Sequence, residues 1–203
     1  MTTLIVVIVA VVVVAVVVAL VLRTRRTAAL RNQFGPEYDR TVDESGKRAG
    51  VRELKDRQAR HDELELTPLD PSTAQRLRDE WRLAQERFVD APAESVADAH
   101  RVLRTALEAR GYPTRDDDDR VAMLSVDHAD VLDRYRTGMA TEAKWREQGT
   151  TDTEDLRLAM QHYRSVFDRV VGETANAYPN DDSTAGAATT DQGSRAAEPR
   201  TRD

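Results

Sequence analysis

The sequence contains no cysteine, which excludes disulfide bonds, thiolate metal ligands and cysteine nucleophiles. Aromatic residues make up only 5% of it and charged residues 33%, a balance typical of amphipathic helices rather than of a sandwich or barrel. It also has no phosphate-binding glycine loop and no Gly-x-Ser-x-Gly elbow, the commonest nucleotide-binding and hydrolase signatures. The net charge of −6 argues against a nucleic-acid partner, because phosphate binding relies on a basic surface. We therefore expect an all-α protein.

One long apolar run stands at the N-terminus. From Leu4 to Leu22 every residue is Val, Ile, Leu or Ala. At about 1.5 Å per helical residue, this run spans the ~30 Å hydrocarbon core of a bilayer. A cleaved signal peptide would instead have positive charge before a shorter apolar core, and Met1-Thr2-Thr3 carries none. We predict an uncleaved, single-pass transmembrane helix.

Basic residues follow this run directly, at Arg23, Arg25, Arg26 and Arg31. Because positively charged flanks stay on the cytoplasmic side, the pattern predicts a cell-membrane protein with its N-terminus outside and its C-terminal domain in the cytoplasm. The same arginines are candidates for contact with anionic lipid head groups. An envelope-facing domain is the alternative if the topology is inverted.

The segment 23–66 is predicted to be a basic juxtamembrane stretch followed by a polar helix. The first helix should run past the membrane until Gly35 and Pro36 end it. Phe34 and Tyr38 would then lie in a turn, where we consider them possible interaction residues. From Ser45 to Leu64 the chain reads as a helix with only a thin apolar stripe.

The segment 67–172 is predicted to be a bundle, giving about four to five amphipathic helices in all. Asp70 can cap a helix that starts with Pro71, and Asp90 can cap the next one before Pro92. Two apolar stripes at helical spacing then predict an antiparallel hairpin that ends at Gly111. Their members are Ala74, Leu77, Trp81, Ala84 and Phe88, followed by Val96, Ala99, Leu103 and Ala106.

Further helices are expected in the second half of this segment. The acidic run Asp116 to Asp119 should open a short helix, where carboxylates meet the positive end of the helix dipole. A metal site is the rival interpretation of this run, but adjacent side chains on a helix point in different directions. The next helix should run to about Gln148 and stop at Gly149, and Gly138 within it indicates close packing.

The last helix has the widest apolar stripe. Thr151 and Glu154 have capping-box spacing at its start, and Gly172 is predicted to end it. The stripe consists of Leu156, Ala159, Met160, Tyr163, Val166, Phe167 and Val170. Residues 173–203 have little to bury and are predicted to form a disordered tail.

Candidate chemical groups are sparse. The histidines His61, His100, His128 and His162 form no i, i+4 pair of the kind that a helical zinc site shows, and we interpret each as a surface or core-rim residue. Trp145 lies off the main apolar stripe, so it is a candidate interaction anchor. We predict no catalytic residue, no metal and no cofactor.

Five short motifs of the sequence are Phe34-Gly35-Pro36-Glu37-Tyr38-Asp39-Arg40, Arg87-Phe88-Val89-Asp90, Arg110-Gly111-Tyr112-Pro113, Leu124-Ser125-Val126-Asp127-His128 and His162-Tyr163-Arg164. Together they resemble a family of small actinobacterial single-span membrane or secreted proteins of no assigned activity. The similarity covers residues 30–171. It implies an anchored architecture and transfers no catalytic residue.

The predicted organisation is an anchor at 1–22, a juxtamembrane segment at 23–66, a bundle at 67–172 and a tail at 173–203. An anchor joined to a charged helical domain favours a non-enzymatic adaptor or scaffold that binds the bilayer and a protein partner, or itself. The alternative is an enzyme or small-ligand binder with a pocket between the helices near Trp81, Tyr112, His128 and Tyr163.

Overall fold

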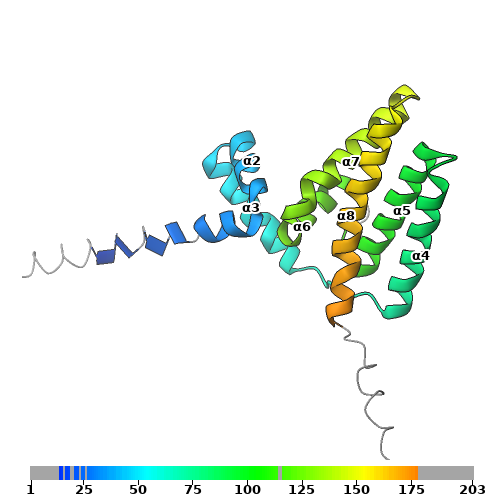
Figure 1. The fold of residues 1–203 in the computed structure, drawn as a ribbon. Helices are drawn as coiled ribbons and strands as arrows, with labels where there is room; N and C mark the ends of the chain where they lie inside the picture. Colours follow the sequence, from blue (N-terminus) through cyan, green and yellow to red (C-terminus); the bar gives the residue numbers. More distant parts are fainter. Residues whose placement is uncertain are drawn as a thin grey trace, which may run out of the picture.

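Regular structure throughout the described residues is helical, as expected for the all-α class. The computed structural model describes residues 14, 15, 17, 18, 21, 22, 24, 25, 27–113 and 116–177, with side chains up to residue 172. Beyond an N-terminal helix whose described part ends at residue 34, the helices in chain order are α2 (Pro36–Ser45), α3 (Lys47–Asp62), α4 (Pro71–Arg87), α5 (Pro92–Arg110), α6 (Asp117–Asp127), α7 (Ala129–Gln148) and α8 (Thr153–Ala177) (Figure 1).

The predicted transmembrane helix, Leu4 to Leu22, lies mostly outside these residues. Its described members are helical and exposed; they are Val14, Ala15, Val17, Val18, Val21 and Leu22. Within the part of the chain that the structure describes, no helix is both long enough and apolar enough to cross a membrane. Of the predicted tail at 173–203, residues 178–203 also lie outside the described residues, whereas residues 173–177 are helical and belong to α8, so the prediction is wrong for them.

Four helices form an up-down-up-down bundle: α4, α5, α7 and α8 (Figure 1). The predicted hairpin of α4 and α5 is confirmed, and α7 and α8 form a second hairpin. The two hairpins pack together mainly through α5 and α8. The short helix α6 joins the two hairpins. The predicted stripes face the shared core, where Trp81 and Phe167 stack with ring centroids 4.5 Å apart. Burial of these apolar faces is the main stabilising term of the bundle.

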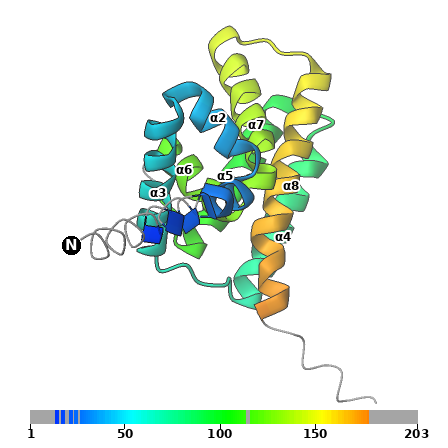
Figure 2. The same ribbon diagram turned by 90° about the vertical axis from the view of Figure 1, so that its left-hand side faces the viewer.

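The residues before the bundle form a second, smaller unit, which we call the N-terminal lobe (residues 27–62). Figure 2 shows it on the side of α6 and α7, away from α4. It has its own apolar core, made of Leu30, Phe34, Tyr38, Leu54 and, from α6, Val126. The lobe is therefore packed against the bundle.

The predicted turn around Tyr38 is wrong. The first helix ends before Gly35 as expected, but Pro36 occupies the first position of a new helix, α2. Gly35 has a φ of +49°, a left-handed conformation that glycine adopts at little cost and that lets the chain reverse sharply. Since proline is well suited to the first helical position, the same dipeptide ends one helix and starts the next.

Two of the predicted caps at helix starts are also wrong. Asp70 caps α4 as expected, accepting a hydrogen bond from the Thr73 N–H at 2.9 Å. Asp90 does not cap α5, which Ala91 precedes without a side-chain cap. At the start of α8 the capping carboxylate belongs to Asp152 rather than to the expected Thr151.

The predicted helix ends are mostly confirmed. Gly111 and Gly149 adopt left-handed conformations that close α5 and α7. Gly172, however, does not end α8, which continues to Ala177. A glycine inside a helix costs only about 1 kcal/mol relative to alanine, so it is a weak stop when no turn geometry requires it.

Candidate functional site

A buried ion network joins the N-terminal lobe to the bundle, and we call it the Glu37 joint. Glu37 of α2 is only 4% exposed. Both Nη atoms of Arg136 on α7 donate to its carboxylate, at 2.6 and 2.7 Å, and Arg57 of α3 donates at 2.9 Å. A bidentate guanidinium pair fixes orientation as well as distance. Three helices are thereby held in one mutual arrangement.

The charge of Glu37 is stabilised in spite of burial. Burial alone would raise the pKa of this carboxyl group, because it disfavours the charged form. The hydrogen bonds and positive charges of Arg136 and Arg57 outweigh that effect and lower the pKa of Glu37 below its ordinary value. The joint is therefore charged at neutral pH.

A second polar contact lies between α3 and the end of α6. His61 Nε2 lies 2.6 Å from Asp127 Oδ2, and the Tyr112 hydroxyl donates to the same oxygen at 2.8 Å. The Tyr112 hydroxyl is also 3.3 Å from His128 Nε2. Tyr112 thus contacts both Asp127 and His128, although it lies 15 positions before Asp127 in the sequence.

The third polar cluster, the His100 network, lies inside the bundle. His100 Nδ1 lies 2.6 Å from Glu142 Oε2, which also accepts a hydrogen bond from the Tyr163 hydroxyl at 3.0 Å. On its other side, His100 Nε2 lies 3.2 Å from the Tyr135 hydroxyl. Arg146 donates to the second oxygen of Glu142 at 2.5 Å. The network connects α5, α7 and α8.

Burial shapes the acid–base chemistry of the His100 network. It raises the pKa of Tyr163, and the adjacent Glu142 carboxylate raises it further, so this hydroxyl stays protonated. For Glu142, the effect of burial is outweighed by hydrogen bonds from His100 and Tyr163 and by the charges of His100 and Arg146, which lower its pKa. A carboxylate next to an imidazole is a pairing that general bases use.

The His100 network is buried, with His100 7% exposed and Glu142 6% exposed. A fully hydrogen-bonded buried network specifies how helices pack.

The histidine prediction was therefore wrong in part. His100 and His128 are buried, whereas His61 and His162 are partly exposed, in keeping with a core rim. A signal for His100 was present, because it stands four residues after Val96 on the buried face of α5. The partner Glu142 lies 42 residues away, so the pairing itself had no local signature.

Three surface hollows bear on the predicted pocket. One of about 310 Å³ lies between α4 and α8, one of about 580 Å³ on the outer face of α3, and one of about 370 Å³ near the α4–α5 and α7–α8 turns. Of the residues predicted to surround a pocket, Trp81 lines the first of these. Tyr112, His128 and Tyr163 line none of the three, so none of these hollows brings the four residues together.

The acidic run at the start of α6 serves the helix and its neighbours. Asp116 accepts the N–H of Asp118 as a cap, Asp117 pairs with the buried Arg120, and Asp119 pairs with Arg60 of α3 at 2.8 Å. Among the described residues there is no group of three or more metal-binding side chains.

The structure separates the predicted interaction residues. Phe34 and Tyr38 are 0% and 5% exposed in the core of the N-terminal lobe, so their rings face no partner in this conformation. Trp145 is half-buried against the main core and lines the cavity near the turns. Its role as an interaction anchor stays a prediction.

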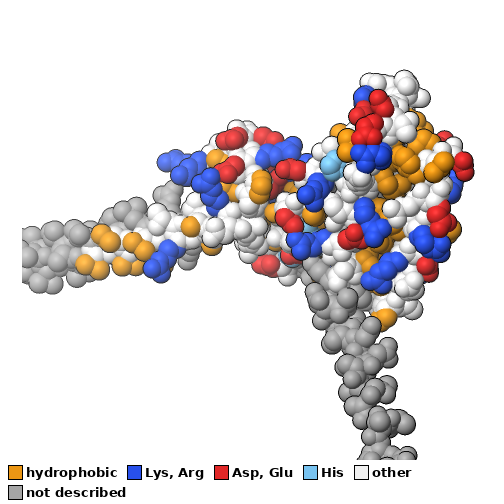
Figure 3. Space-filling view, viewed as in Figure 1, with side chains coloured by type: hydrophobic (Ala, Val, Ile, Leu, Met, Phe, Trp, Pro, Cys, Tyr) orange, Lys and Arg blue, Asp and Glu red, His pale blue; other side chains and the backbone are white. Residues whose placement is uncertain are grey.

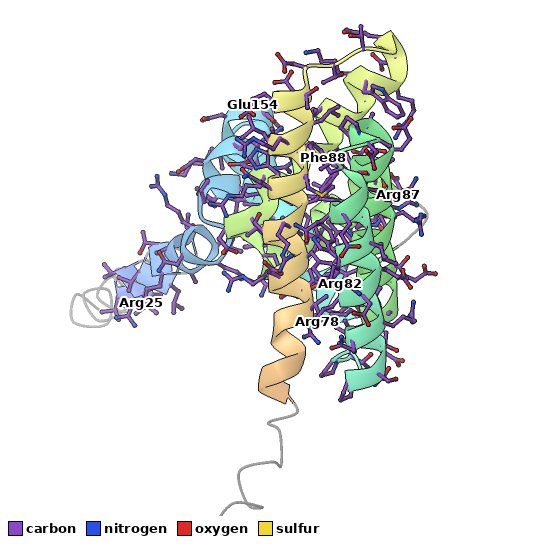
Figure 4. All side chains as sticks on the ribbon, turned by 45° about the vertical axis from the view of Figure 1, so that its right-hand side comes forward. Arg25, Arg78, Arg82, Arg87, Phe88 and Glu154 are labelled. Atoms are coloured by element: carbon purple, nitrogen blue, oxygen red, sulfur yellow. The ribbon has the colours of Figure 1, made fainter. Side chains whose placement is uncertain are left out.

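The predicted membrane-flanking arginines are placed in part. Arg25 is exposed on the N-terminal helix (Figure 4). Arg31 pairs with Asp39 at 3.0 Å, and its guanidinium lies 5.9 Å from the centre of the Tyr38 ring. Arg23 and Arg26 lie outside the described residues.

Fold and contacts together define an all-α protein: a four-helix bundle with an N-terminal helical lobe fixed to its side. Among known proteins, no family model, curated protein or solved structure matches the chain. The resemblance to small actinobacterial membrane proteins stays a prediction.

Proposed function

We propose that this protein is a membrane-anchored helical adaptor that presents its bundle to a cytoplasmic protein partner in a fixed orientation. The observation that carries the proposal is the Glu37 joint. A flexible linker would leave the bundle free to rotate about its anchor. Here the helix that follows the predicted anchor instead packs through Leu30 and Phe34 into the N-terminal lobe. The bidentate Glu37–Arg136 pair then fixes that lobe to the bundle.

The surface of the N-terminal helix favours anchoring. Its described apolar residues include Val14, Val17 and Leu22, which are 61%, 52% and 49% exposed. Figure 3 shows hydrophobic side chains along this helix, and charged side chains scattered over the visible face of the bundle among hydrophobic and other side chains. Exposed apolar surface is unfavourable in water by about 25 cal/mol per Å², so a bilayer is a suitable environment for this helix.

The first experiment is immunoprecipitation of the full-length chain from mild-detergent extracts of membranes. An adaptor should recover a partner, or a second copy of itself, in stoichiometric amounts. The variant Glu37→Gln loses the charged joint and should recover less, whereas Glu44→Gln, on the exposed face of the same helix, should not. Recovery of neither a partner nor a second copy would contradict the proposal.

The second experiment tests the orientation. A reporter fused after Asp203 that is active only in the cytoplasm should give signal. If only a reporter specific for the outer side gives signal, the bundle faces the envelope and the proposed partner cannot be cytoplasmic.

A further inference from the structure

The hollow between α4 and α8 has the features of a ligand site, and we call it the α4/α8 cleft. It has a volume of about 310 Å³, which is at the lower end of the range of small-molecule sites. The residues that line it are Arg78, Trp81, Arg82 and Gln85 of α4, and Arg164, Phe167, Asp168, Val171 and Gly172 of α8. Figure 4 shows Arg78 and Arg82 in the space between these two helices.

The rim of the cleft carries an excess of positive charge, with three guanidinium groups and one carboxylate. Arg164 is already engaged: its Nε donates to Asp168 at 2.7 Å and its Nη1 to Gln85 at 3.1 Å. Arg82 pairs with Glu86 at 2.9 Å, outside the cleft. Arg78 is exposed and makes no ion pair with the described residues.

The floor of the cleft is aromatic. Trp81 and Phe167 are 1% and 2% exposed and stack on each other, and the Arg164 guanidinium lies 5.9 Å from the centre of the Trp81 ring. The indole N–H of Trp81 has no hydrogen-bond partner among the described residues.

Gly172 keeps one wall of the cleft open. A Cβ at this position would meet no atom of the described side chains within 4 Å, although the residue stands inside α8. Alanine would favour the helix here by about 1 kcal/mol. Because Gly172 lines the cleft, a larger side chain at this position would reduce the room for a ligand.

We propose that the α4/α8 cleft binds a small organic anion, with a phosphate or carboxylate group at Arg78 and an attached flat apolar group over the Trp81 and Phe167 edge. Guanidinium groups bind such oxyanions through paired, charge-assisted hydrogen bonds. An aromatic floor adds apolar contact for the remainder of the ligand. This inference goes beyond the adaptor function and does not depend on it.

The two tryptophans of the chain provide the test, because each gives one indole signal in a ¹H–¹⁵N NMR spectrum. The full-length chain in detergent micelles, labelled with ¹⁵N-tryptophan, is titrated with phenyl phosphate, with inorganic phosphate and with phenol. The variant Trp145→Phe assigns the signals. We expect phenyl phosphate to shift the Trp81 signal saturably, while the Trp145 signal stays in place. Inorganic phosphate and phenol should each bind more weakly than phenyl phosphate.

Matched variants on α4 separate the cleft from general charge. Arg78→Ala should weaken phenyl phosphate binding by about tenfold, since one charge-assisted contact is lost. Arg76→Ala removes another exposed arginine of the same helix, which pairs with Glu80 and does not line the cleft, and it should change nothing. Gly172→Leu should block binding by filling the cleft, and an unchanged Trp145 signal verifies that each variant is folded.

Three outcomes would overturn the inference. They are a Trp81 signal that phenyl phosphate does not move, equal effects of Arg78→Ala and Arg76→Ala, and full binding by a folded Gly172→Leu variant. None of these bears on recovery of a protein partner, so failure here is distinguishable from failure of the adaptor proposal.

Discussion

Gly138 of α7 lies directly against the phenol ring of Tyr163 on α8. A Cβ at position 138 would lie 2.7 Å from the Tyr163 Cε1 atom, closer than two non-bonded carbon atoms approach in proteins. This contact allows α7 and α8 to pack closely enough for Tyr163 to reach Glu142 in the His100 network. The packing that Gly138 suggested from the sequence is confirmed.

Gly138→Ala should therefore destabilise the protein by about 1–3 kcal/mol, since the ring must move in a well-packed core. Gly172→Ala is the matched control, because that glycine is also helical but has open space around it. The control should be as stable as the wild type or slightly more stable. Denaturant unfolding followed by circular dichroism measures both, and equal stability of Gly138→Ala and the wild type would disprove the contact.

Glu37→Ala should loosen the N-terminal lobe from the bundle. The substitution leaves Arg136 and Arg57 without their shared carboxylate, and breaking a buried ion pair costs about 3–5 kcal/mol. Hydrogen–deuterium exchange should increase in residues 36–62, while α5 and α8 remain protected. Glu44→Ala, whose ion pair with Arg40 is exposed, should leave exchange unchanged. Increased exchange of all helices together would show that the lobe and bundle unfold as one unit.

Acid should weaken the fold through two carboxyl groups. The folded-state pKa values of Glu37 and Glu142 both lie below the ordinary value of 4.5. The unfolded chain therefore binds protons more readily, so the stabilisation is complete above that value and is lost as pH falls below it. The denaturant midpoint should decline as pH is lowered through 4.5, and less steeply in Glu37→Gln/Glu142→Gln. Identical slopes for the variant and the wild type would assign the acid sensitivity to other groups.

Asp70 and Asp90 should differ in their effect on stability, although both precede a proline that starts a helix within two residues. Asp70 accepts hydrogen bonds from the Thr73 N–H and the Ser72 hydroxyl, which lower its pKa, whereas α5 has no side-chain cap. Asp70→Ala should lower the melting temperature by a few degrees, and Asp90→Ala should leave it unchanged. Thermal unfolding of the two variants measures both melting temperatures. A similar decrease in both variants would contradict the assignment of Asp70 as the cap of α4.

Asp70 and Asp90 also show how far helix caps can be predicted from local sequence. Asp70 stands directly before Pro71, in the position where its carboxylate reaches the first turn. Asp90 is separated from Pro92 by Ala91, and that one residue moves its side chain out of the capping position. Capping depends on backbone angles at one residue, which composition and approximate spacing do not specify.

The candidate sites were less predictable than the helices. Apolar stripes on α4, α5 and α8 identified their buried faces, because helical periodicity is a local property. The partners of Glu37 and His100 were not predicted, since Arg136 lies 99 residues from Glu37 and Glu142 lies 42 residues from His100. A pocket near Trp81 was one of the predicted alternatives, but the arginines of the cleft were not predicted, because they come from two helices that meet only in the folded chain.

By itself, the sequence determined the helical class, most helix boundaries and the faces that are buried. These follow from interactions between residues a few positions apart, namely apolar repeats, glycine stops and proline starts. Only the tertiary structure decided that Phe34 and Tyr38 are core residues, that Glu37 joins the N-terminal lobe to the bundle, and that an arginine-rich cleft opens beside Trp81. Such features depend on which helix faces meet, and side chains far apart in the chain acquire partners only through that packing.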